Sequence, residues 1–323
     1  MKLPNYFYTY FLANFLKFQC LSHQKLTFPY KGMAAFYYYS STSSPPPQKR
    51  PFLDGKRKKM KIIGKDSVSP DSFLFTFSIG DYTELGLPIC QHLKVFSPNP
   101  TGKVPGQWNG KPTESGSEIF RKYTPISHSV ASAAQLIIKV YRKDENPSFP
   151  DGGKVSQYFE TLEVGDFIDV DGPVGKMTYL GKGVFLKDGK THTFKKLALL
   201  AGGTGITPHF QLISAILEDS RDNTEMRLIY ASKTEKDIFL RKEFDELEKN
   251  SNGQFKITYT IDKATKDWPH ESGYINTNMI QKYMPGPSED TLVIMCGPNA
   301  MKLQAIVPSL KELGYDFNFV WNF

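Results

Sequence analysis

The hydrophobic pattern of this chain changes its period once, close to residue 195, and that change constrains the fold more than any other feature. Before it, short runs of strand-forming residues alternate with turn-forming clusters. After it, continuous apolar runs alternate with stretches of helical periodicity. The first pattern is typical of an antiparallel barrel. The second indicates a parallel sheet with right-handed crossovers, so we expect two domains, the β-barrel first and the α/β domain second.

Three runs in the first half carry the strand signal, because they are rich in β-branched and aromatic residues. They are 73–77 (FLFTF), 92–96 (HLKVF) and 136–141 (LIIKVY). Between the second and third lies a polar stretch, 97–118, which eight Gly or Pro residues interrupt. We expect a loop there, and a loop of this length is either mobile or functional.

The second half opens with a continuous apolar run, 197–201 (LALLA), as expected of a strand buried on both faces. Later segments repeat the alternation of strand and helix. Strands are predicted at 228–231, 255–261 and 292–296, and helices at 210–217 and 237–249. The chain's 323 residues are enough for two such domains.

Charge separates the start of the chain from its body. Residues 1–53 carry +6 and no acid, and residues 54–65 add +5, so the rest carries −4 of the net +7. A nucleic-acid enzyme would concentrate its basic residues on the folded domain, so none is expected here. We predict three segments: a leader over 1–53, a β-barrel domain over 54–182 and an α/β domain over 183–323.

The leader contains an apolar and aromatic segment at 6–18, which has about the length of a signal h-region or an interfacial anchor. A Ser/Pro linker follows at 40–47, and Met33 offers an internal start. A membrane tether, a cleaved targeting sequence and an uninformative extension all remain open. No run approaches the roughly 20 apolar residues of a spanning helix.

Three cysteines, Cys20, Cys90 and Cys296, are too few and too scattered for a disulfide framework or a zinc site. A reducing compartment is the simpler interpretation. The six histidines show no metal-ligand spacing and no catalytic triad. No metal site is therefore predicted.

A glycine turn, 201–208 (AGGTGITP), joins the buried strand to the next helix. Gly203 and Gly205 allow backbone to approach a ligand where a side chain would collide. The helix that begins near Thr207 points free amides at the same space, which suits a pyrophosphate. A tight strand-to-helix turn needs glycines in any case, so this motif alone is weak.

A second motif, 121–127 (RKYTPIS), ends a predicted strand and combines a cation, a ring and hydroxyls. Arg121 can hold phosphate bidentately, Tyr123 can lie against an aromatic ring, and the hydroxyls of Thr124 and Ser127 can bond its edge. This set suits a flavin. An ordinary barrel strand with a surface arginine is the alternative.

Three further positions carry weaker signals. The turn 152–156 (GGKVS) is either an anion-binding helix start or a helix capped by Ser156. Cys296 ends an apolar strand at the carboxyl edge of the sheet, where ligands bind in open α/β folds. Asp237, at the start of the second helix, either accepts ribose hydroxyls or complements the helix dipole. The stretch 172–175 (GPVG) is expected to be a turn.

In this order and spacing, the motifs resemble those of the NADH–cytochrome b5 reductases, a family of the ferredoxin–NADP reductase superfamily. The likeness runs from about Lys61 to Phe323. It is carried by RKYTPIS (121–127), LIIKVY (136–141), GGKVS (152–156), GPVGKMTY (172–179), GGTGITP (202–208), TEKD (234–237) and MCGPNAM (295–301). The resemblance implies an FAD-binding antiparallel β-barrel followed by an NADH-binding α/β domain.

The resemblance also implies a role for each matching residue. Arg121 would pair with the FAD pyrophosphate, Tyr123 would pack on the isoalloxazine, and Thr124 would bond near its reactive nitrogen. Further FAD contacts would come from Ser127, Lys139, Tyr141, Gly153, Val155, Ser156 and Thr207.

On the nucleotide side, Asp237 would favour NADH over NADPH. The NADH pyrophosphate would face Gly203, Thr204 and Gly205, and the nicotinamide would lie beside Cys296, Gly297 and Pro298. Phe323, the last residue, would lie near the flavin. Thr124, Cys296 and Phe323 would therefore be the residues closest to the chemistry.

The implied activity is transfer of a hydride from NADH to FAD and then of single electrons to cytochrome b5 or a similar small haem protein. Another haem protein or a quinone is the alternative acceptor, and a nucleotide-binding redox sensor without turnover is a remote one. The chain is expected to be a monomer. A tether would place it on the cytosolic face of the endoplasmic reticulum or mitochondrial outer membrane, and mitochondrial import is the other possibility.

Three features depart from the family pattern. The loop at 97–118 is longer than the family usually shows. Asn299 and Ala300 stand where two prolines are usual, which would loosen the nicotinamide turn. Lys233 lies near the expected adenosine ribose, where a cation would weaken the preference for NADH.

Overall fold

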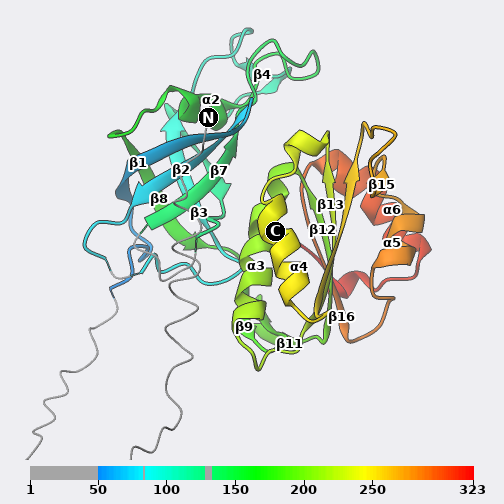
Figure 1. Ribbon diagram of the computed structural model, residues 1–323. Helices are drawn as coiled ribbons and strands as arrows, with labels where there is room; N and C mark the ends of the chain where they lie inside the picture. The colour runs from blue at the N-terminus through cyan, green and yellow to red at the C-terminus, as the bar shows by residue number, and fades with distance from the viewer. Residues whose placement is uncertain (1–49, 83, 128–132) are drawn as a thin grey trace, which may run out of the picture. The chain divides into compact units, whose positions relative to one another are not determined.

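The computed structural model describes residues 50–82, 84–127 and 133–323 (Figure 1). The apolar segment at 6–18, Cys20, Met33 and the Ser/Pro linker lie outside these residues, so the predictions made for them stay predictions. Within the described part of the chain, no helix is long and apolar enough to cross a membrane.

The first domain is built on a six-stranded antiparallel sheet (Figure 1). Its strands, in spatial order, are β6 (Glu118–Tyr123), β3 (His92–Pro98), β8 (Phe167–Val174), β1 (Lys58–Ser69), β2 (Ser72–Ser78) and β7 (Ala133–Lys139). The predicted strands at 73–77, 92–96 and 136–141 lie on β2, β3 and β7. Because alternate residues of a strand point to one face, Phe75, Val95 and Leu136 are buried together in a single core.

Two ends of this domain differ from expectation. Phe52 and Leu53, which were assigned to the leader, are buried in the sheet's core. The stretch 172–175 is not an isolated turn, because Gly172, Pro173 and Val174 extend strand β8. The extension pairs with β3, since Val174 lies opposite His92.

Helix α2 (Lys154–Thr161) covers this core, and its Val155 and Phe159 are fully buried there. The polar stretch before β6 is an ordered loop. It contains a short hairpin of β4 (Gln107–Trp108) and β5 (Lys111–Pro112).

A three-stranded antiparallel sheet connects the two halves of the chain. It consists of β9 (Met177–Gly181), β10 (Val184–Lys187) and β11 (Lys190–Thr193). Tyr179 and Phe185 of this sheet are buried in the same core as the strands of the second domain. The boundary predicted after residue 182 falls between β9 and β10.

The second domain is a six-stranded parallel sheet, and the predicted order of domain classes is confirmed. Its strands, in spatial order, are β15 (Glu271–Ser272), β14 (Phe255–Ile261), β13 (Glu225–Ser232), β12 (Lys196–Gly202), β16 (Thr291–Cys296) and β17 (Val320–Asn322). The chain adds strands to one side of β12 and then crosses to its other side, so strand order reverses between β12 and β16.

Helices cover both faces of this sheet, which explains the continuous apolar run of β12 (Figure 1). Leu197 and Leu199 pack in the core that includes α3 (Ile206–Glu218) and α4 (Arg241–Asn250). Ala198 and Leu200 pack in the opposite core, with α5 (Thr277–Tyr283) and α6 (Val307–Glu312). Three short 3-10 turns and one π-helical segment complete the described part of the chain: η1 (Gly203–Gly205), η2 (Glu235–Asp237), η4 (Phe317–Phe319) and the π-helical η3 (Met301–Ile306).

The helix predicted at 237–249 was placed too early. Helix α4 starts at Arg241, after Leu240 adopts a left-handed backbone conformation with φ of 57°. Asp237 instead ends the short turn η2. Its carboxylate and the Thr234 side chain form a reciprocal capping box, so a local polar turn replaced the expected first helical turn.

Candidate functional site

Two turns meet at the carboxyl ends of β12 and β16, where strand order reverses. Ala201 and Cys296 are register partners at the ends of these adjacent strands. A Cβ atom added to Gly205 would lie 2.4 Å from the carbonyl oxygen of Cys296, so only glycine permits this approach. Gly203 has φ of +55°, and a Cβ there would meet nothing within 4 Å. The reversal point of a parallel sheet is where such folds bind ligands.

His209 lies between the glycine turn and strand β16, although no histidine was selected from the sequence. The side chain is fully buried on α3. Its Nδ1 lies 2.9 Å from the Gly205 carbonyl oxygen and its Nε2 lies 3.3 Å from that of Ile294. The position of a histidine on the buried face of a helix was the only signal in the sequence, and it does not distinguish a structural from a functional role.

Phe323 is placed by the same histidine. Its ring meets the His209 ring edge-on, with centroids 5.4 Å apart. Its backbone N–H donates to the Met295 carbonyl at 3.2 Å, which continues the β16–β17 pairing to the last residue. The terminal ring therefore lies beside the strand that ends in Cys296.

Cys296 keeps its proton at neutral pH, because burial raises the pKa of its thiol to about 11. It is half-buried and bonded to no other cysteine. A neutral thiol is a packing surface with weak polarity rather than a nucleophile. Gly297 and Pro298 continue this turn, and Gly297 has φ of +152°.

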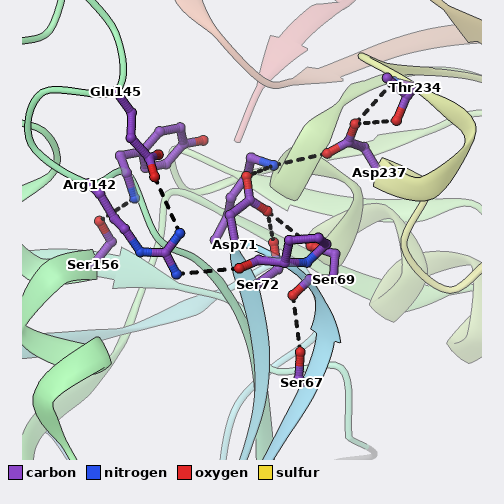
Figure 2. A network of polar contacts seen from close by, with 12 residues as sticks. Ser67, Ser69, Asp71, Ser72, Arg142, Glu145, Ser156, Thr234 and Asp237 are labelled. Carbon is purple, nitrogen blue, oxygen red and sulfur yellow. Dashed lines mark hydrogen bonds and ion pairs between the residues drawn. The ribbon is translucent and has the colours of Figure 1, made fainter.

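Lys139 links the two domains through the carboxylates of Asp71 and Asp237. Figure 2 labels these two acids and shows the bonds of Asp237 to Thr234. The Lys139 Nζ lies 2.6 Å from Asp71 Oδ2 in the first domain and 3.1 Å from Asp237 Oδ1 in the second. The Lys139 side chain is only 9% exposed, so the two acids offset the cost of burying its charge. Desolvation opposes the change, but hydrogen bonds from Thr234 and Lys139 keep the pKa of Asp237 below its usual range.

Further contacts cross the same border close to Lys139. Strand β7, which ends just before Tyr141, lies against the turn η1, which contains Thr204. Gln211 of α3 accepts the backbone N–H of Cys90 at 2.9 Å. Thus the end of β7 lies against the turn that follows β12. The two segments are about sixty residues apart in the chain.

On β6, Arg121 is an exposed cation with a fixed geometry. Its Nη1 donates to Glu114 Oε1 at 2.7 Å and to the Phe120 carbonyl at 2.8 Å. The side chain of Arg121 is 46% exposed, so a ligand can reach it. A guanidinium can hold a phosphate group bidentately, and the role predicted for Arg121 stays a prediction.

The residues after Arg121 point in different directions. Tyr123 packs edge-on against Phe159 of α2 at 5.4 Å, and burial raises the pKa of its hydroxyl. Thr124 follows the end of β6 and is half-buried. Ser127 Oγ accepts the backbone N–H of Gln135 at 3.1 Å, so this hydroxyl is already engaged with β7.

The start of α2 has no side-chain cap, because Gly153 is its N-cap residue. Ser156, the cap expected from the sequence, lies inside the first turn. Its Oγ accepts the Tyr141 N–H and donates to the Gly153 carbonyl, both at 3.2 Å. Uncapped amides at a helix start fit an anionic ligand. The Glu114 carboxylate, held between Arg121 and Lys154, already occupies an anion position beside this helix.

Thr204 and Thr207, the last two predicted residues of the glycine turn, lie around the start of α3. The Thr207 hydroxyl donates to the Thr204 carbonyl at 3.3 Å. Thr207 itself is buried in the first turn of α3. The structure thus brings the predicted nucleotide residues to one sheet edge, and the predicted flavin residues to β6, the end of β7 and α2.

A flavin domain joined to a nucleotide domain defines the class of two-domain reductases, and comparison with known proteins agrees. Residues 59–179 match the model of the oxidoreductase FAD-binding domain, and residues 199–305 match that of the oxidoreductase NAD-binding domain. NADH-cytochrome b5 reductase 2 of Danio rerio is 40% identical over 264 residues, which cover 79% of this chain and 81% of the relative. NADH-cytochrome b5 reductase 3 of Mus musculus is 39% identical, with 79% and 83% covered.

This chain belongs to the NADH-cytochrome b5 reductase family, and it is an oxidoreductase with FAD and NAD-binding domains. The cytochrome b5 reductase domain of Ulva prolifera nitrate reductase has a similar structure, with a TM-score of 0.75 and 34% identity, covering 84% of this chain and 100% of that domain. Nitrate reductase [NADH] 2 of Phaseolus vulgaris is 40% identical, but the match covers only 27% of that protein.

Proposed function

We propose that this chain uses NADH to reduce FAD and passes single electrons to cytochrome b5 or a similar small haem protein. The family of the chain supports the nucleotide, the flavin and the class of acceptor. The relatives that match along most of their length are named for cytochrome b5, which favours this acceptor over a quinone.

One observation carries the proposal at the level of the site. The strand end that bears Lys139, predicted to line the flavin, contacts Asp237, predicted to line the nucleotide. A hydride donor and its acceptor must lie in contact, and holding two rings in that geometry lowers the barrier by several kcal/mol. A border at which both sets of predicted residues meet supports this proposal.

FAD, when bound, supplies the hydride acceptance and the single-electron release. The chain's residues would bind and orient the two cofactors. Arg121 and the start of α2 would hold the flavin's diphosphate, while Tyr123 and Phe323 would pack against its ring. Cys296 would contribute a neutral thiol beside the nicotinamide, since its pKa of about 11 leaves it protonated. No side chain needs to act as an acid or a base in the hydride step.

The proposal includes two properties of the whole protein. We propose that the chain acts as a monomer, because one chain contains both the FAD-binding and the NAD-binding domain. We also propose that its basic N-terminal segment associates with a membrane, because clustered lysine and arginine residues attract anionic lipid. Fractionation of cells that express the full chain tests the second property.

Reconstitution with FAD tests the cofactor assignment. The purified chain should become yellow with FAD, and NADH added without oxygen should bleach the flavin absorbance within the mixing time of a stopped-flow instrument. NADPH should bleach it more slowly, because Asp237, which is predicted to lie beside the ribose, would repel a 2′-phosphate. A protein that stays colourless after reconstitution would contradict the proposed function.

A further inference from the structure

The long loop before β6 is hydrogen-bonded to the residues just before helix α2. We call residues 99–117 the strap. Asp151, just before α2, accepts the backbone N–H groups of Lys103 at 2.7 Å and of Asn109 at 2.6 Å. The Gly152 carbonyl accepts the Trp108 indole N–H at 2.8 Å and the Asn109 side-chain amide at 2.9 Å. The Asp151 N–H also donates to Asn109 Oδ1 at 2.7 Å, so five hydrogen bonds fix the strap on two consecutive residues.

Lys154, the first residue of α2, is buried beneath the strap, with a side chain only 2% exposed. Its ammonium donates to Asn99 Oδ1 at 2.8 Å, to Glu114 Oε2 at 2.8 Å and to the Thr113 hydroxyl. An ammonium has three donors, and strap residues accept all three. A buried lysine satisfied in this way holds the strap at one register on α2.

Glu114 connects this anchored lysine to Arg121. One carboxylate oxygen accepts from Lys154, and the other accepts from Arg121 Nη1 at 2.7 Å. The two cations lower the pKa of Glu114 to about 2, so the carboxylate is ionised at any physiological pH. Both contacts of Arg121 found among the described residues use Nη1, since the Phe120 carbonyl also accepts from it.

The remaining edge of the guanidinium, Nε with Nη2, is the one that can hold a phosphate bidentately. We propose that Glu114 is a positioning residue, which orients Arg121 so that this edge faces the diphosphate of FAD, and that the strap exists to hold Glu114 there. The inference rests on the proposed function, because it takes the ligand of Arg121 to be FAD. It adds residues of the strap to a site that β6 and α2 were expected to form alone.

The opposite effect of Glu114 is also physically possible. A carboxylate near a diphosphate repels it, and a competitor for Arg121 would weaken FAD binding. The two effects predict opposite changes when the charge is removed. Geometry favours positioning, because Glu114 is held by Lys154 as well as by Arg121 and leaves one guanidinium edge available.

Titration of FAD into the flavin-free full chain, followed by quenching of flavin fluorescence, distinguishes these effects. Glu114→Gln should weaken FAD binding about ten-fold, the value of one charge-assisted hydrogen bond. Glu118→Gln is the matched control. The side chain of Glu118 is similarly exposed, at 42%. Its Oε2 accepts from Arg57 Nη1 at 2.7 Å, so Glu118 pairs with Arg57 rather than with Arg121. Its FAD affinity should stay within about two-fold of the wild-type value.

A double-mutant cycle separates positioning from a general loss of structure. In an Arg121→Lys background there is no guanidinium edge to orient, so Glu114→Gln should change FAD affinity much less than it does in the wild type. An equal effect in both backgrounds would show that Glu114 acts independently of Arg121. Tighter or unchanged FAD binding by Glu114→Gln would also overturn the inference.

Failure of the proposed function would give a different result. If Arg121→Ala retains FAD with wild-type affinity, Arg121 is not the diphosphate ligand, and the assignment of β6 is wrong. If Arg121→Ala loses FAD while Glu114→Gln does not, the flavin site stands and only the role of the strap is wrong.

Discussion

The Asp237 carboxylate serves both domains. One oxygen accepts from Lys139 of the first domain at 3.1 Å, and the other accepts from the Thr234 hydroxyl at 2.7 Å. These contacts hold the acid at the end of η2, close to the glycine turn. An acid in this position can accept ribose hydroxyls and repel a 2′-phosphate.

Replacing Asp237 tests this role. In Asp237→Thr, the ratio of kcat/KM for NADPH to that for NADH should rise about ten-fold, because a negative charge near the 2′-phosphate is removed. Lys139 then keeps only Asp71 as an acidic partner, so its positive charge adds to the attraction. Steady-state kinetics with both nucleotides measure the ratio.

Glu235→Gln is the control for that substitution, since Glu235 lies in the same turn but pairs with Arg241. Its nucleotide ratio should match that of the wild type. An unchanged ratio in Asp237→Thr would show that another residue, such as Lys233, sets the preference.

At the scale of elements, the turn between β12 and α3 depends on a backbone contact. Any residue other than glycine at position 205 would have a Cβ atom, and this atom would collide with the carbonyl oxygen of Cys296. Gly205→Ala must therefore separate the two turns, and it should lower the free energy of unfolding by about 2 kcal/mol or more. Urea denaturation measures the loss, and the affinity for NADH should fall with it.

The neighbouring glycine provides the comparison for this prediction. A Cβ at position 203 meets nothing within 4 Å, so Gly203→Ala suffers only from its φ of +55°. That strain costs about 1 kcal/mol. If Gly205→Ala is no more destabilising than Gly203→Ala, the close approach of the two turns is wrong.

Which elements could be predicted from the sequence depends on the range of their interactions. The spacing of apolar residues predicted β2 and β12, because a strand that is buried on one or both faces carries that pattern in its own consecutive residues. Of the two alternatives for the turn at 152–156, the cap by Ser156 does not form: Gly153 is the N-cap residue, and the Ser156 hydroxyl accepts the Tyr141 N–H.

The order of the strap was not predictable for the same reason. Its main contact, Asp151 with Asn109, joins residues 42 positions apart, and polar residues in a loop do not reveal distant partners. The carboxylate of Glu114 and the imidazole of His209 were missed in the same way, since each contacts residues from other elements.

At the scale of the whole molecule, two histidines make stability depend on pH. Burial, with Lys122 and Lys94 nearby, lowers the pKa of His92 from 6.5 to about 4. Burial also lowers the pKa of His209. The unfolded chain binds these protons near pH 6.5 and the folded chain does not, so protonation favours unfolding.

The free energy of unfolding should therefore fall as the pH is lowered from 6.5 towards 4. Carboxylates with lowered pKa values, such as Glu114, lose their contribution only at lower pH. Urea denaturation of the wild type and of His92→Gln at pH values from about 7 to about 5 measures the slope. A slope that is the same in both proteins would mean that His92 is not a source of the dependence.

The activity proposed for the whole molecule is electron transfer from NADH to a small haem protein. The most direct measurement follows NADH-driven reduction of purified cytochrome b5 by the FAD-loaded chain, with ferricyanide as a parallel acceptor. Ferricyanide accepts electrons from almost any flavoprotein of this class, so only the protein acceptor tests the claim. We predict rapid reduction of both acceptors with NADH and slower reduction with NADPH. Reduction of ferricyanide without reduction of cytochrome b5 would contradict the claim.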